Sequence, residues 1–250
     1  MAGAEVKKIT EAMTKSLKQM LNEDNAYMVS ILKKMKSTTY VQPGEVPNID
    51  LYMDQVTKFM DEHLESSKRR SDDKLLTKTM INNYTKNNLL PSPNKKKYTK
   101  DHMYTLLFIY YLKNVMPMDD TQSVLQPLTD MFFGENGSID MEHIYKEVFD
   151  IEYGQSFSLT RDVVRKYNRS KQSFKDVEDP KEKDFLQAFM FISMLCFDVY
   201  MKKTMIEKII DDNFSISSLK KAEETEETKA TKDNKEIKAS GKKSKKEHKN

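Results

Sequence analysis

The sequence predicts a mainly α-helical fold, and two observations lead to that prediction. Apolar residues recur every three or four positions along most of the chain, the spacing that places them on one face of a helix. Only 7 prolines and 6 glycines stand among 250 residues, and most of them lie between the periodic segments. The single cysteine, Cys196, excludes an intramolecular disulfide and points to a reducing compartment.

Residues 1–46 are expected to form an amphipathic helical extension. Its apolar positions at helical spacing are Val6, Ile9, Met13, Leu17 and Met20 or Leu21, with Ile31, Leu32 and Met35 as their expected continuation. The block 41–47 contains two prolines and a glycine, so it breaks any helix and predicts a boundary. Residues 1–21 hold no uninterrupted apolar stretch, and we therefore expect neither a signal peptide nor a membrane-spanning start.

A helix after Asp50 and a second helix after Thr77 are predicted next, each with a capping side chain at its start. The apolar stripe of the first helix is Met53, Val56, Phe59, Met60 and Leu64. In the second helix, Ile81 and Tyr84 fall on one side, whereas the opposite side is polar, basic and free of acid. The asparagine pair 87–88 suits the left-handed residue that ends a helix.

Three further helix starts are predicted along the chain. Thr99 caps a helix that is apolar on most sides, which is typical of a core element. Pro117 marks the start of another helix, in which Pro127 predicts a kink. After the turn at 134–137, Ser138 or Asp140 can cap the next helix.

Residues 134–214 are expected to form a helical C-terminal domain. Within it, residues 151–174 allow either a short β-hairpin or a helix, and a helix is favoured for 161–167. The most apolar helix spans roughly 181–212 and must be buried, either within one protomer or in a subunit interface. Because Cys196 stands among large apolar residues of this helix, we expect it to be a buried structural thiol.

The basic charge is concentrated in one part of the chain, although the net charge is only +3. Residues 68–105 hold ten lysines and arginines against three aspartates, and residues 74–100 hold seven lysines and no acid. A stretch that gathers lysines and avoids acids is typical of a surface that binds a polyanion, since lysines release the counterions condensed on phosphates. Residues 215–250 carry a net charge of +4 with almost no apolar residues, so this charged tail is expected to be disordered.

The string LTKTMINNYTKNNLLPSPNKKKYTKDHMYTLLFIYYLKNV, residues 76–115, resembles the DNA-binding half of MerR-type winged helix-turn-helix regulators. Residues 80–84 correspond to the recognition helix of that family, residues 88–91 to the leucine turn after it, and residues 95–98 to the basic wing. From Pro47 onward, most of the chain also resembles an uncharacterised family of low-GC Gram-positive bacteria. That family is a domain of unknown function with an expected role in transcription.

The resemblance implies a winged helix-turn-helix module over residues 47–133 that binds double-stranded DNA. In this reading Asn82 and Asn83 face base edges, because an amide can pair with adenine, while the lysines hold phosphates. The candidate DNA-binding residues are Lys78, Thr79, Asn82, Asn83, Lys86, Lys95, Lys96, Lys97, Tyr98 and Lys100. The sequence departs from the MerR pattern in two ways. Lysine and asparagine replace the arginines of the recognition helix, and the linker 65–76 is longer than the turn of a tight helix-turn-helix.

No motif in the sequence indicates an enzyme, a cofactor or a metal site. The six glycines form no phosphate-binding loop, and the four histidines are scattered without a metal-binding string. We expect a cytoplasmic transcriptional regulator without a membrane segment. The helix at 181–212 is expected either to form a dimer interface or to be a core element of one protomer. The alternative is a scaffold protein whose basic face binds an acidic partner. No motif points to a small-molecule effector.

Overall fold

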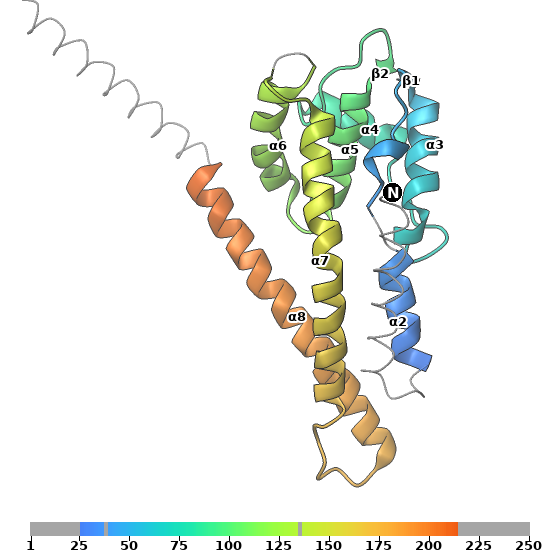
Figure 1. Ribbon diagram of the computed structural model, residues 1–250, viewed down its shortest axis with the longest axis vertical. Coiled ribbons are helices and arrows are strands. Elements are labelled where there is room, and N and C mark those ends of the chain that lie inside the picture. Colours follow the sequence, from blue (N-terminus) through green and yellow to red (C-terminus); the bar gives the residue numbers. More distant parts are fainter. Residues whose placement is uncertain (1–25, 38–39, 135–136, 215–250) are drawn as a thin grey trace, which may run out of the picture. The chain divides into compact units, whose positions relative to one another are not determined.

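A computed structural model describes residues 26–37, 40–134 and 137–214, and it is mainly helical, as predicted (Figure 1). In chain order its elements are α2 (Ala26–Ser37), the 3₁₀ helix η1 (Pro43–Glu45), β1 (Leu51–Tyr52), α3 (Met53–Leu64), the 3₁₀ helix η2 (Glu65–Ser67), α4 (Lys78–Lys86), β2 (Lys97–Tyr98), α5 (Lys100–Lys113), α6 (Met118–Phe132), α7 (Met141–Ser170) and α8 (Pro180–Asn213). The chain divides into two compact units, residues 1–201 and 202–250, and of the second unit only the end of α8 and Phe214 are described. The predicted apolar stripe at residues 6–21 and the tail 215–250 lie outside the described residues.

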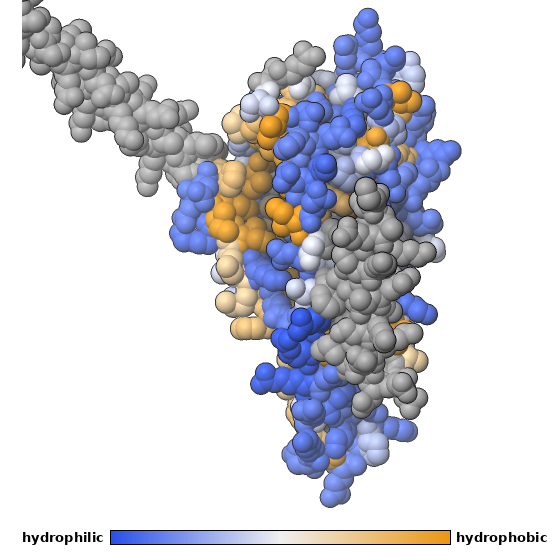
Figure 2. Space-filling view, viewed as in Figure 1, coloured by the Kyte–Doolittle hydropathy of each residue, from blue (hydrophilic) through white to orange (hydrophobic). Residues whose placement is uncertain are grey.

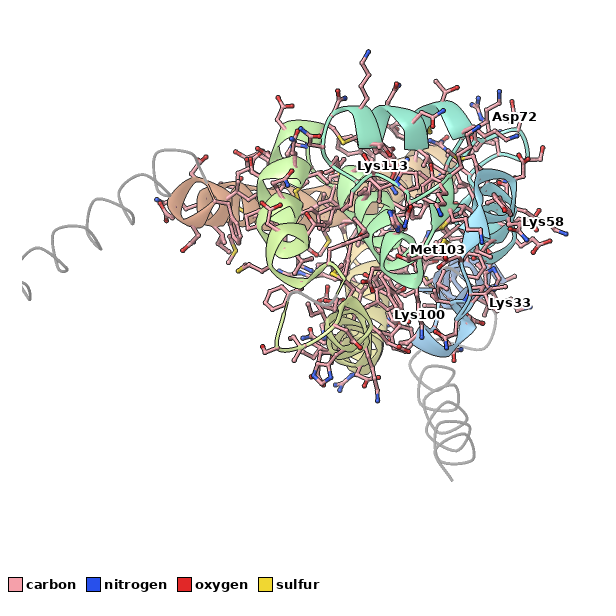
Figure 3. All side chains as sticks on the ribbon, turned by 90° about the horizontal axis from the view of Figure 1, so that it is seen from above. Lys33, Lys58, Asp72, Lys100, Met103 and Lys113 are labelled. Carbon is pink, nitrogen blue, oxygen red and sulfur yellow. The ribbon has the colours of Figure 1, made fainter. Side chains whose placement is uncertain are left out.

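Helix α5 is the centre of the larger core. Its side chains with no exposed surface are Met103, Tyr104, Thr105, Leu106, Leu107 and Ile109. The helices α6 and α7 contact α5, as does strand β2, and Figure 3 shows Met103 among the helices while Lys58 of α3 points outward. The prediction of a core helix after Thr99 is therefore confirmed, because a helix covered on all sides has no room for a polar stripe.

Helix α3 begins at Met53, so the predicted cap at Asp50 is wrong. Its first turn is closed instead by Gln55, whose Oε1 accepts the backbone N–H of Tyr52 at 2.8 Å. The start is delayed because Leu51 and Tyr52 form strand β1, which keeps the backbone extended up to the helix. The predicted apolar stripe is confirmed, since the buried residues of α3 are Val56, Phe59, Met60 and Leu64.

Helix α7 runs without a break from Met141 to Ser170, so the alternative of a β-hairpin within 151–174 is wrong. Asp140 is the N-cap of this helix, and its Oδ1 accepts the N–H of His143 at 2.7 Å. Apolar residues at helical spacing explain its length, because they reach a second core cluster beyond the first. That cluster contains Met28 of α2, Val163, Val164 and Tyr167 of α7, and Phe191 of α8.

Helix α8 matches the predicted range, and one of its faces is buried within the chain, whereas burial of the rest in a subunit interface stays a prediction. Phe191 is 5% exposed, whereas Phe185 on another face is 69% exposed. Cys196 is exposed, so its expected role as a buried thiol is wrong: the helix turns this position away from α7. Figure 2 shows apolar residues on the surface along part of α8. Helix α8 is long and apolar enough to cross a membrane, but core helices of soluble proteins meet the same criteria of length and composition.

Candidate nucleic-acid interface

Helix α4 separates its residues into a buried and an exposed face, as its sequence predicts. Thr77 is the N-cap, and its Oγ1 accepts the backbone N–H of Met80 at 3.2 Å. Ile81 and Tyr84 are 0% and 7% exposed and belong to the larger core. The exposed residues of α4 are Lys78, Thr79, Asn82, Asn83 and Lys86. The outer face is therefore basic and amide-bearing, and it contains no carboxylate.

The chain leaves α4 through a left-handed residue and a pair of buried leucines. Asn88 has a φ of 57°, which asparagine tolerates better than most residues. Beyond it, the N–H groups of Leu89 and Leu90 both donate to the carbonyl of Tyr84, at 2.9 and 3.1 Å. Both leucine side chains are buried, so they anchor the segment that leads from α4 to the lysine cluster.

The lysine cluster forms a tight β-turn, here called the lysine turn and defined as residues 94–97. The N–H of Lys97 donates to the carbonyl of Asn94 at 2.9 Å, and the two residues form an antiparallel bridge. Lys95 and Lys96 between them have φ values of 48° and 64°. Positive φ at both central positions is the pattern of a type I′ turn, which ordinarily takes Asn-Gly because a Cβ is strained there. Two exposed lysines therefore occupy the strained tip of the turn.

A two-stranded sheet and an aromatic contact hold the lysine turn to the core. Strand β2 pairs antiparallel with β1, with Leu51 opposite Tyr98 and Tyr52 opposite Lys97. Tyr98 is 3% exposed, and its ring lies edge-on to His102 at 5.4 Å between ring centroids. Its predicted role in contacting DNA is therefore corrected: the side chain is buried and positions the turn, because register places it on the inner face of the strand.

His102 is a neutral, buried side chain beneath this sheet. It is 2% exposed, its ring lies 4.7 Å from that of Phe133, and its Nδ1 accepts the N–H of Thr99 at 3.0 Å. Burial lowers the pKa of His102 to about 4, outweighing the opposite effect of backbone groups of Ser92 and Pro91. At neutral pH the ring therefore adds no charge to the interface and acts as a spacer between β2 and α5.

Two of the predicted phosphate-binding lysines are already paired with carboxylates. Lys78 pairs with Asp54 of α3 across exposed surface, so a phosphate can displace this weak pair. Lys100 is 24% exposed and lies 2.6 Å from an oxygen of Glu142, as its position beside α7 in Figure 3 allows. We therefore correct the assignment of Lys100, because its ammonium group joins α5 to α7. In the described part of the chain, no carboxylate pairs with Lys86, Lys95 or Lys96.

Two side chains that position α4 were not predicted from the sequence, Lys113 of α5 and Gln122 of α6. The Nζ of Lys113 donates to the carbonyl of Leu75 at 3.1 Å and to the hydroxyl of Tyr84 at 3.5 Å, and burial lowers the pKa of Lys113. Gln122 of α6 donates to the carbonyl of Asn87 at 3.1 Å. The role of Lys113 could have been suspected from the sequence, because a lysine there ends the apolar run of α5. No local sequence pattern predicts the contact of Gln122.

The linker between α3 and α4 is longer than a tight turn, yet it is ordered by its own contacts. The N–H groups of Arg69 and Arg70 donate to Oδ2 of Asp73, at 3.0 and 2.9 Å. Leu75 and Leu76 are buried in the larger core. The linker therefore fixes where α4 begins relative to α3, despite its length.

Residues 41–148 match the model of a family described as a Domain of unknown function (DUF1836). The match covers the larger core, which extends from Val41 to Tyr145, and includes both α4 and the lysine turn. The expected resemblance to a domain of unknown function is confirmed, over a shorter stretch than predicted. No curated protein and no solved structure matches the chain. Among the described residues, no group of three or more side chains could hold a metal ion.

Proposed function

We propose that residues 41–148, the stretch that matches the family model, form the DNA-binding part of a cytoplasmic transcriptional regulator. In this proposal α4 is the recognition helix and the lysine turn is the wing. The observation that carries it is the division of α4. Its apolar face lies in the core, whereas its outer face offers lysines and amides without a single acid.

The chain order supports a winged helix-turn-helix arrangement like that of MerR-type regulators. Two helices, α3 and α4, come first, and a tight β-turn and the core helix α5 follow. The turn is braced by β1, a strand that precedes α3 in the chain, and Asn94 bridges to Lys97 on the other strand of the turn. A protruding turn braced by a strand in this way is what the resemblance predicts for a wing.

The two surfaces have different expected tasks on DNA. Helix α4 has nine residues, about 13 Å in length, and a helix of this size fits the major groove. Asn82 and Asn83 are exposed on it and can pair with adenine through one donor and one acceptor each. Among the predicted DNA-binding lysines, Lys86, Lys95 and Lys96 are exposed and pair with no carboxylate of the described residues. In this proposal they contact phosphates and set affinity rather than sequence preference.

The test is DNA binding by the full-length protein, first in a selection from random and genomic fragments and then by fluorescence anisotropy at several salt concentrations. Removing the charges of the lysine turn (K95Q/K96Q/K97Q) should weaken binding and lower the slope of log affinity against log salt by up to about 2.7. The matched control K146Q/K175Q/K181Q removes the same charge from exposed positions of α7, α8 and the loop between them. It should leave both quantities close to the wild-type values.

Substitutions on α4 test the reading of sequence. N82A/N83A should reduce the ratio of specific to non-specific affinity by at least tenfold, on the order of 1–3 kcal/mol for each lost bidentate contact, while non-specific binding stays. If K95Q/K96Q/K97Q and K146Q/K175Q/K181Q lose the same amount of DNA affinity, the role of the lysine turn is contradicted. Absence of any selected sequence would favour the alternative, in which the basic face binds an acidic protein.

A further inference from the structure

One face of α8 between Pro180 and Met201 is used within the chain itself. The Nε2 of Gln187 donates to the carbonyls of Lys171 and Ser173, at 3.0 and 3.1 Å, and so closes the turn between α7 and α8. Farther along, Asp198 pairs with Lys166 of α7 at 2.6 Å. The rings of Phe191 and Tyr167 meet edge-on between these two contacts. This face therefore fixes α8 against α7.

The opposite face of α8 carries a second, unpartnered apolar row, here called the α8 stripe. It consists of Phe185, Phe189, Ile192, Cys196 and Val199. At about 100° per residue these five positions fall within an arc of about 80°, roughly opposite Gln187 and Asp198. Phe185, Phe189, Ile192 and Val199 are 69%, 59%, 58% and 63% exposed, and Cys196 is exposed as well. No contact within the described residues explains why this row is apolar.

The spacing of the α8 stripe points to another helix of the same kind as its occupant. Successive members are separated by four, three, four and three residues, which is the heptad spacing of a coiled-coil seam. Ala188 and Ser193 flank the seam with small side chains, so a second helix backbone can approach closely. A two-fold interface needs the same pattern on both partners, and a second copy supplies it.

We infer that the α8 stripe is the interface of a homodimer, formed by pairing with the α8 stripe of a second copy. Its five side chains expose on the order of 500 Å², so two copies bury about 1,000 Å², the lower bound for a specific interface. A lipid bilayer is a poor occupant, because α7 lies against α8 and is rich in charge there: Lys166 pairs with Asp198 of α8, and Arg165 and Arg169 are exposed on the same stretch of α7. This inference does not depend on DNA binding, and neither does its test.

Cys196 reports on the stripe in the unmodified protein. Its reaction with a maleimide is measured from about 0.1 to about 100 µM protein, together with the mass by sedimentation equilibrium. We expect the thiol to become protected as the protein concentration rises, in step with a mass approaching twice 29.3 kDa. Protection that does not vary with concentration while the mass stays at 29.3 kDa would overturn the inference in favour of a cover from the same chain. Protection that requires phosphatidylcholine–phosphatidylglycerol vesicles would overturn it in favour of a membrane.

A charged substitution at the centre of the stripe gives the second test. I192E should raise the dimer dissociation constant by at least about 30-fold, as for a central interface residue, and should leave the helix content by circular dichroism unchanged. M131E places the same charge on an exposed apolar site of α6 and should leave the dimer intact. A wild-type monomer at the highest concentration, or a dimer that survives I192E, would overturn the inference.

Discussion

Replacing the tip of the lysine turn by the residues its backbone favours should stabilise the protein while weakening its binding to DNA. The substitution is K95N/K96G. Lys95 and Lys96 both stand at positive φ, where a side chain with a Cβ costs about 1–2 kcal/mol. Glycine has no Cβ, and asparagine tolerates the left-handed region better than lysine, so K95N/K96G removes the strain at position 96 and reduces it at position 95.

The expected gain follows from two opposing effects. Relief contributes about 1–2 kcal/mol at position 96 and a smaller amount at position 95, and the larger backbone freedom of glycine in the unfolded chain removes about 1 kcal/mol. The net stabilisation is therefore about 1 kcal/mol, which corresponds to a rise in Tm of several degrees for a domain of about 110 residues. The loss of two cations should lower the salt slope of DNA binding by about 1.8.

The assay compares K95N/K96G with K95Q/K96Q in urea unfolding and in DNA binding. Both variants lose the same two charges, but glutamine keeps the strained backbone, so the difference in unfolding free energy isolates the strain. Their DNA affinities should fall together. If K95N/K96G is no more stable than K95Q/K96Q, the strain at the turn is not a cost, and the reasoning is refuted.

Three further predictions concern the stability of the module that carries the interface. Because burial lowers the pKa of His102 from 6.5 to about 4, the unfolded chain alone binds this proton between those pH values. The free energy of unfolding should therefore be unaffected by His102 above pH 6.5 and should fall by about 3 kcal/mol as the pH is lowered to about 4. Urea titrations of wild type and H102Q across this pH range measure the difference. M103A, at a site with no exposure, should cost about 2–5 kcal/mol in urea unfolding, whereas M131A on the surface should cost less than about 0.5. T77A removes the cap of α4 and should cost about 1 kcal/mol by the same assay, and an unchanged midpoint would contradict the role of the 3.2 Å contact.

The helix starts that could be predicted are those decided within a few residues of the chain. Thr77 and Asp140 accept an N–H three residues ahead, so a capping side chain before an apolar period was a sufficient signal. Asp50 is not a cap, because strand β1 pairs with residues more than forty positions away and keeps the backbone extended up to Met53. No local sequence pattern predicts that pairing. The left-handed Asn88 was predictable from residue type, whereas the left-handed Lys95 and Lys96 were not, because lysine has no preference for that conformation.

The candidate interface shows the same division between local and long-range causes. The acid-free, lysine-rich stretch and the polar face of α4 follow from the sequence, because charge and helical period are properties of short segments. Which lysines remain available, and that Tyr98 is buried, depended on Asp54, Glu142 and His102, which other helices bring alongside.

The amino-acid sequence was sufficient for the helical class, the apolar stripes and the location of the basic charge, since each depends on composition and spacing alone. Tertiary packing was needed to place the lysine turn on a strained hairpin, to give His102 a buried site and to turn Cys196 outward. The physical reason is that burial and strand pairing join residues far apart in the chain. The free energies of burial and strand pairing depend on which surfaces meet in the folded protein. The sequence of one segment does not indicate which distant segment it will contact.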